Sequence, residues 1–213
     1  MASPESIPVL QKVLFDTQAS IPVRLTALKA LGNIGTDEAI AVILDALKRQ
    51  DDLLEFKAYQ VLGERKAGQA LALLSERLTQ VEQQYSEWRR IRDTGREDFT
   101  EQETEAWAKR LDEAQPTPYR GFTLAYAIAQ IDPQASGIKL LSHDLAEVRQ
   151  GAWMGLGKAG DVALLRLLYP KWRDTDESIF RVAAYRAIDI FSSTWKATAM
   201  LRFSKNSRHF TIK

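Results

Sequence analysis

The sequence predicts an all-α fold, a solenoid of about five stacked helical hairpins with one inserted helical-hairpin arm. Residues 23–35 and 148–160 repeat one pattern of Val, Arg, Ala, Leu and Gly. Within each copy the apolar residues recur every three or four positions, the spacing that places them on one face of a helix. A single hairpin leaves that face uncovered, so neighbouring copies have to stack.

Further copies of the pattern start at Leu54, Arg120 and Phe180. The interval between the second and third copies is about twice the others, so it holds one repeat plus an insertion. We therefore expect one domain over residues 1–213, with a helical insertion at 79–118. We call the helices that carry the pattern the motif helices.

Local signals set the bounds of the first hairpin. Ser20 precedes Pro22 and is expected to cap the first motif helix, which Gly35 can end in a left-handed conformation. Thr36 then caps the second helix, expected over Asp37–Arg49. Asp132-Pro133 and Gly160-Asp161 mark the same short break later in the chain.

The insertion is predicted to form a long helix followed by a second helix that runs back toward the stack. Gly95 is expected to supply a left-handed stop for the first helix at about Arg92, and Thr100 to Glu103 forms a capping box for the second. The acids at the start of the second helix are expected to pair with the arginines at the end of the first. The first helix is predicted from apolar residues spaced by three and four: Leu71, Leu74, Leu78, Val81, Tyr85, Trp88 and Ile91.

The motif Val-Arg-x-x-Ala-x-x-Ala-Leu-Gly-x-Ile-Gly at 23–35 resembles HEAT-like repeats, in the short form of the phycobilin lyases and of many bacterial regulatory proteins. The near copy at 148–160 carries the same resemblance. It implies ladders of Asp and Arg between repeats, for which Asp144 and Asp176 are in place. The family spans lyases, adaptors, nucleic-acid binders and sensor domains, so the resemblance predicts the fold rather than one function.

Composition excludes several classes of function. The 29 basic and 28 acidic residues give a net charge of +1, which disfavours a dedicated nucleic-acid binder. There is no cysteine, and no signal peptide or apolar run of membrane-spanning length, so we expect a cytoplasmic protein and no membrane partner. No phosphate loop, nucleophile elbow or metal spacing is present, so we predict no enzyme, no cofactor and no metal. His143 has no metal-binding neighbour in sequence and is interpreted as a helix-end residue.

Candidate partner-binding residues lie in two places, and both have a plain structural alternative. The arm's tryptophans either close its own seam or dock a partner, because aromatic and arginine residues dominate interface hot spots. The residues at 196–213 form a basic tail whose simplest interpretation is a solvated terminus. A column of aromatic residues at 59, 153 and 185 is interpreted as packing. The candidates are Tyr85, Trp88, Arg89, Arg92 and Trp107 on the arm, and Tyr169, Lys171, Trp172 and Arg173 in a later loop.

The favoured function is an interaction scaffold that binds a protein on a concave face lined by the second helices, and on the arm. Two alternatives stay open. One is a tetrapyrrole-handling protein similar to the phycobilin lyases, with a lyase-like activity. The other is a nucleic-acid binder similar to the HEAT-like alkylpurine glycosylases, which the balanced charge disfavours.

Overall fold

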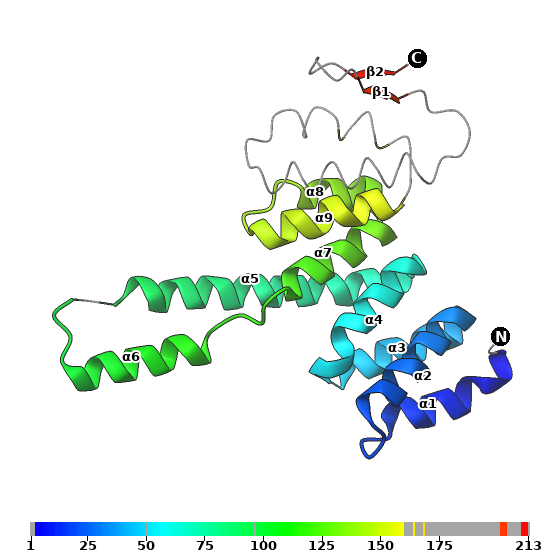
Figure 1. Ribbon diagram of the computed structural model, residues 1–213, viewed down its shortest axis with the longest axis horizontal. Coiled ribbons are helices and arrows are strands. Elements are labelled where there is room, and N and C mark those ends of the chain that lie inside the picture. The colour runs from blue at the N-terminus through cyan, green and yellow to red at the C-terminus, as the bar shows by residue number, and fades with distance from the viewer. Residues whose placement is uncertain are drawn as a thin grey trace.

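The computed structural model describes residues 3–49, 51–95, 97–159, 164, 168, 201–203 and 210–212. Within them the chain is a stack of helices from which one long hairpin projects (Figure 1). The all-α prediction is confirmed. The helices are α1 (Ile7–Phe15), α2 (Ile21–Ile34), α3 (Asp37–Lys48), α4 (Asp52–Glu64), α5 (Leu71–Asp93), α6 (Glu101–Glu113), α7 (Arg120–Ile131), α8 (Ile138–Leu140) and α9 (Ala146–Ala159), with short helical turns η1 (Pro4–Ser6), η2 (Gly68–Ala70) and η3 (Pro133–Gly137).

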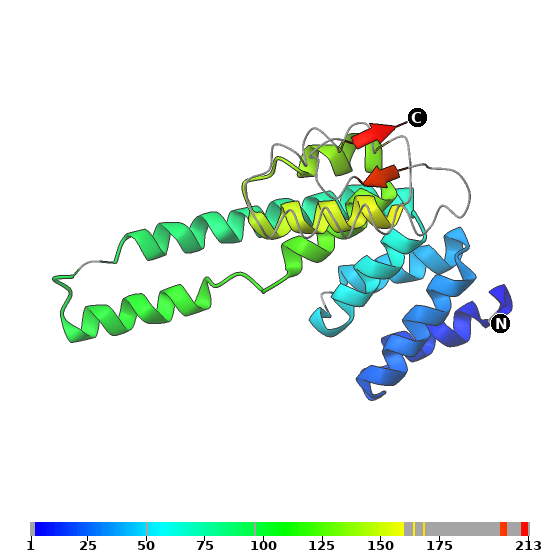
Figure 2. The same ribbon diagram turned by 45° about the horizontal axis from the view of Figure 1, so that its top comes forward.

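The motif helices α2, α4, α7 and α9 pack side by side in chain order (Figure 2). Small residues permit the closest of these contacts. A Cβ atom at Gly151 or Gly155 would overlap a carbonyl oxygen of α7, so only glycine lets α9 approach α7 this closely. The repeated Ala and Gly of the motif are therefore packing residues.

One motif position supplies the centre of the core. Leu28 and Tyr59 are fully buried at equivalent places in α2 and α4, and Trp153 follows in α9 with 3% of its surface exposed. The packing interpretation of the aromatic column is confirmed for these residues, whereas Tyr185 lies outside the described residues. Burial of an aromatic side chain is among the largest single contributions to a core.

Polar side chains link successive motif helices. Arg24 on α2 donates to the carbonyl of Leu14 at 2.9 Å and to the carboxylate of Asp51, which caps α4. Arg120 at the start of α7 pairs with the buried Glu55 of α4 at 2.7 Å. The Asp–Arg ladder that the resemblance implied is thus present between the first repeats.

The rungs expected at Asp144 and Asp176 stay a prediction. Arg149 donates to the main-chain carbonyls of His143 and Asp144, at 2.6 and 3.0 Å, and these bonds do not involve the Asp144 carboxylate. Asp176 lies outside the described residues. The carbonyls available at the turn before α9 are close enough to hold the guanidinium.

Most of the predicted helix ends are confirmed. Gly35 has a φ of 67°, in the left-handed region that favours glycine. Thr36 accepts from the Ala39 amide at 3.3 Å, and the helix it caps ends at Lys48. Ser20 occupies the N-cap of α2, but its side chain makes no capping hydrogen bond. The start of α2 therefore depends on Pro22 instead.

The arm consists of the outer part of α5 together with α6, and it extends well away from the stack (Figure 1). The capping box of Thr100 and Glu103 is present in both directions. Gly95 does not adopt the predicted left-handed conformation. It lies instead against the ring of Trp107, which a Cβ atom would approach to 2.9 Å, so the glycine provides clearance.

Two short strands lie near the C-terminus, where the sequence predicted only a basic tail. β1 (Leu201–Phe203) pairs antiparallel with β2 (Phe210–Ile212), and Arg202 lies opposite Thr211. Alternating polar and apolar residues in Phe210–Ile212 are typical of a strand. In the described part of the chain no helix has the length and apolar character needed to cross a membrane.

Candidate functional site

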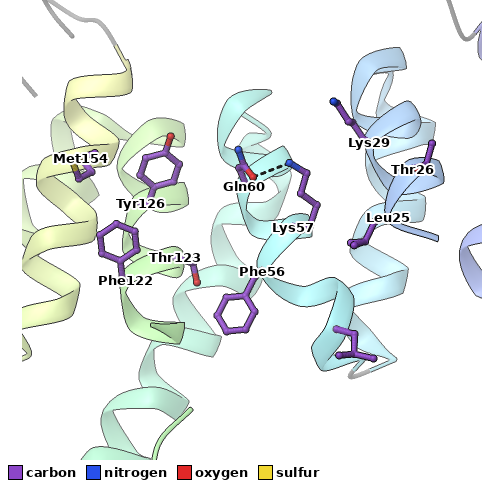
Figure 3. A pocket seen from close by; sticks show the side chains of 11 residues that line it. Leu25, Thr26, Lys29, Phe56, Lys57, Gln60, Phe122, Thr123, Tyr126 and Met154 are labelled. Atoms are coloured by element: carbon purple, nitrogen blue, oxygen red, sulfur yellow. Dashed lines mark hydrogen bonds between the residues drawn. The ribbon is translucent and has the colours of Figure 1, made fainter. Parts of the chain in front are cut away.

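A groove of about 720 Å³ runs across the four motif helices, and Figure 3 shows the side chains that line it. Each of α2, α4, α7 and α9 contributes to it, so the groove is a product of the stacking. The lining residues are Leu25, Thr26, Lys29, Leu53, Phe56, Lys57, Gln60, Phe122, Thr123, Tyr126 and Met154.

The groove is made by the same positions of successive motifs. Leu25, Phe56 and Phe122 each stand two residues after the start of their copy, at Val23, Leu54 and Arg120 respectively. The motif position that follows, and the motif position one helical turn beyond it, supply most of the other residues that line the groove. A single helical face, repeated by stacking, therefore produces a continuous surface.

Aromatic side chains give the groove its apolar character. Phe122 and Tyr126 are one turn apart on α7, with ring centroids 6.4 Å apart and planes at 10°. Both rings, and that of Phe56 on α4, are half-buried. Leu53, at the start of α4, is 64% exposed. Apolar side chains that stay open to water on a hollow surface are typical of a binding site.

The charged residues that line the groove are both lysines. Lys57 donates to Oε1 of Gln60 at 2.9 Å, and Gln60 in turn donates to Glu64 at 2.8 Å, beyond the lining. Lys29 is exposed on α2. Burial, followed by the charge of Glu64, raises the pKa of Tyr126, so this hydroxyl stays a neutral donor.

This groove is built from the motif helices rather than from the second helices of the hairpins. Every lining residue on a helix lies on α2, α4, α7 or α9, and the expectation that the second helices line the binding face stays a prediction. The motif helices make continuous contact with one another, which gives their outer faces a common surface. The recurrence of Leu25, Phe56 and Phe122 at one motif position is the sequence signal that could have revealed it.

Three of the arm candidates, Trp88, Arg92 and Trp107, make their contacts within the arm. Trp107 is half-buried and its Nε1 donates to the carbonyl of Ile91 at 2.8 Å, which closes the seam between α6 and α5. The guanidinium of Arg92 lies 5.1 Å from the ring centroid of Trp88. Neither residue lines the groove. These contacts support the packing interpretation of both tryptophans, and their role in partner binding stays a prediction.

The charges of the arm pair differently from the prediction. Arg90 pairs with Glu87 at 2.7 Å and Arg92 with Asp93 at 2.8 Å, so both arginines find partners on α5 rather than among the acids of α6. Arg90 and Glu87 are three residues apart on one helix and Arg92 and Asp93 are adjacent, so each pair is nearer than residues across a splayed hairpin. The predicted loop residues Tyr169, Lys171, Trp172 and Arg173 lie outside the described residues.

A second, more polar cleft of about 780 Å³ lies where α5 leaves the stack. Arg89 and Tyr85 of the arm candidates line it, together with His143 from the turn after α8. The Nε2 atom of His143 lies 2.6 Å from Glu82, and its Nδ1 accepts from the Leu145 amide at 3.0 Å. Because Nδ1 accepts, Nε2 carries the proton and donates to Glu82.

His143 therefore joins the base of the arm to the turn before α9. Sequence reasoning missed this pair because Glu82 lies far from His143 in the chain. Among the residues that the structure describes, no cluster of three or more His, Cys, Asp or Glu side chains could hold a metal ion.

Comparison with known proteins agrees with this geometry. The model of the HEAT-repeat family matches residues 7–86, which contain α1 to α4 and most of α5. The predicted resemblance to HEAT-like repeats is confirmed, and the stacked motif helices continue the same arrangement through α9.

Among curated proteins, the chain is similar to a deoxyhypusine hydroxylase of Arabidopsis thaliana, with 39% identity over 80 residues. The match covers 38% of this chain and 26% of the relative, so the chain spans about a quarter of that protein. Among solved structures, the CpcE and CpcF complex of phycocyanin lyase from Nostoc sp. PCC7120 covers 90% of this chain and 83% of its own, with 18% identity and a TM-score of 0.38. That score is too low to support a functional inference.

The hydroxylase corrects the prediction that the chain is not an enzyme. That relative is an enzyme by its name, and it is 39% identical to this chain over 80 residues. The earlier prediction depended on the absence of short catalytic motifs, and such motifs are local, whereas a stacked repeat can bring together side chains that are distant in sequence.

Proposed function

We propose that this chain is a HEAT-repeat scaffold that binds a protein partner in the groove across its motif helices. The observation that carries the proposal is the composition of that groove. Three successive motif helices contribute apolar side chains from one equivalent position and α9 adds Met154 from another, so the surface is continuous from one repeat to the next.

The dimensions of the groove favour a protein segment over a small molecule. Neighbouring packed helices lie roughly 8–10 Å apart, so a surface that crosses four of them extends for roughly 30 Å. A bound helix of that length would contain about 20 residues. The tetrapyrrole alternative would occupy only part of such a surface.

The arm is a second contact surface in this proposal, and it differs in character. Its tryptophans close the seam between α5 and α6, so the side chains left for a partner are mainly charged, including Arg89 and the acids of α6. Charged residues at an exposed rim change the rate and specificity of association more than the affinity. The groove would supply most of the binding energy.

Affinity capture with matched variants tests the proposal. The chain, a Phe56→Ala, Phe122→Ala double variant and a Val9→Ala control are immobilised in parallel in lysate of the cells that produce the protein. Val9 is 65% exposed on α1 and lies outside the groove. We expect one stoichiometric protein that the control retains and the groove variant loses.

Three outcomes would contradict the proposal. The groove variant could retain the captured protein, the eluate could contain a visible chromophore instead of a protein, or nuclease treatment could remove the captured material. Circular dichroism of the double variant shows that a loss of capture does not result from unfolding. Both phenylalanines are only half-buried, so the fold should survive their replacement.

A further inference from the structure

We infer that the occupant of the groove is an amphipathic helix with Phe-sized or Leu-sized residues on one face and Asp or Glu beside them. This inference rests on the proposed function and adds the chemistry of the partner. Its basis is the uneven distribution of charge along the groove: lysines on α2 and α4, and uncharged side chains on α7 and α9.

The apolar half of the groove lies over α7 and α9. Phe122 and Tyr126 present two rings on successive turns, and Met154 borders them from α9. Rings at one-turn spacing match apolar residues at one-turn spacing on a docked helix, the arrangement by which amphipathic helices bind apolar grooves. Methionine adapts its shape to such a residue at little cost.

The charged half lies over α2 and α4. Lys29 is exposed and makes no hydrogen bond or ion pair within the described part of the chain, and Lys57 is steadied by its bond to Gln60 (Figure 3). The lysines stand on neighbouring helices, and Lys29 is one turn further along its motif. Their separation is therefore roughly 11 Å, or about seven residues of a bound helix.

The partner should thus carry two acidic residues about seven positions apart, at one end of its apolar stripe. Glu64 accepts from Gln60 and stands outside the lining. It limits the positive potential at the end of α4 without removing it. A basic helix would be repelled by both lysines. It would gain no compensating ion pair from Glu64, because Gln60 already donates to that carboxylate.

A single-stranded nucleic acid fits this surface less well. Over roughly 30 Å a strand would present several phosphates, because neighbouring phosphates are only a few ångström apart. Two lysines are too few to neutralise them. The lining contains no arginine.

Selection from a library tests this inference directly. Random amphipathic helices of about 20 residues, displayed on phage with equal numbers of acidic and basic members, are selected against the chain and against a Lys29→Glu, Lys57→Glu double variant. We expect the chain to enrich acidic peptides about tenfold over basic ones, and the variant to reverse that preference. A Lys12→Glu, Lys48→Glu variant changes the net charge by the same amount as the groove variant, but at positions outside the groove. It should select the same peptides as the unchanged chain.

The outcomes separate the inference from the proposed function. Peptides that lose binding in the Phe56→Ala, Phe122→Ala variant but show no charge preference would overturn the inference and leave the groove as a protein-binding site. Selection of basic peptides by the unchanged chain would overturn it as well. A library from which nothing is enriched, or whose members bind the double phenylalanine variant equally well, would count against both.

Discussion

The stack of motif helices and the arm show the same helical periodicity in sequence but differ in how much they bury. In the stack, α7 is covered by α4 on one side and α9 on the other, and residues such as Leu124 and Ala125 are fully buried. In the arm, α6 packs mainly against α5 and contains no buried residue. A two-helix hairpin has no third layer to cover it.

This difference shows that an apolar stripe in the sequence predicts which face of a helix packs, but not how deeply that face is buried. Leu74, Leu78 and Val81 on α5 are buried because α7 lies beside them, whereas Trp88 further along the same helix is only half-buried. The arm is therefore held by a few contacts at its seam. Elements with few buried contacts open locally at a low free-energy cost, while a stacked core unfolds as a unit.

The largest effect should come from the core of the stack. Trp153→Ala removes an α9 side chain that is 3% exposed in the core, and should lower the free energy of unfolding by about 3–5 kcal/mol. Urea unfolding followed by circular dichroism measures the loss. A change under about 1 kcal/mol would show that α9 is not part of the cooperative stack.

The arm should respond locally to the loss of its own tryptophan. Trp107→Ala deletes the hydrogen bond to the Ile91 carbonyl and the contact with Gly95, so amides of α6 should exchange with solvent about ten times faster or more. Hydrogen exchange read by mass spectrometry resolves α6 from the stack. We expect no change in the exchange of α2 and α4. A loss of protection throughout would contradict the independence of the arm.

Two glycines provide a matched comparison of backbone conformation. Gly35→Ala places a side chain at a φ of 67° and should cost about 1 kcal/mol. Gly68→Ala meets no atom within 4 Å and has no positive φ, so it should be neutral or stabilising by about 0.5 kcal/mol. Thermal melts of both variants decide the matter, and equal destabilisation would refute the assigned role of Gly35.

The smallest effect should appear at the junction of the two regions. Glu147 on α9 accepts from the Gly121 amide at 3.0 Å and from Tyr85 of α5, and burial raises its pKa. A carboxyl with a raised folded-state pKa binds its proton more tightly in the folded state. Its contribution to stability therefore falls as pH rises through that raised pKa.

Replacement of this carboxyl by an amide should remove the pH dependence. Glu147→Gln keeps an oxygen for the Gly121 amide and does not ionise, so its stability relative to the unchanged chain should increase as pH rises from about 4 to about 7. Unfolding at a series of pH values measures the difference. A relative stability that decreases over this range would mean that hydrogen bonds to the carboxylate outweigh its burial.

Much of the fold could be predicted from sequence because it depends on local signals. The left-handed Gly35, the Thr36 cap and the capping box at Thr100 each involve residues within a few positions of one another. The repeated motif then determines the stacking, since each copy has to cover its neighbour.

The site could be predicted only in part because it depends on contacts between repeats. The pairing of Glu82 with His143, and the meeting of Phe56 with Phe122 in one groove, join residues that the sequence separates by a whole repeat. The arm was predicted as a binding site because its aromatic and basic residues are adjacent in the chain. The residues of the groove are spread over several copies of the motif, so no local cluster in the sequence indicates them.

Photo-cross-linking tests most directly whether the groove, rather than the arm, binds the partner. A benzoylphenylalanine placed at Tyr126 in the groove, and in a separate chain at Leu111 on α6, is irradiated in lysate, and the adducts are identified by mass spectrometry. We predict a protein adduct from position 126, reduced at least tenfold by competition with the unlabelled chain but not with its Phe56→Ala, Phe122→Ala variant. A protein adduct from position 111 alone, or an adduct at 126 that is not a protein, would contradict the central claim.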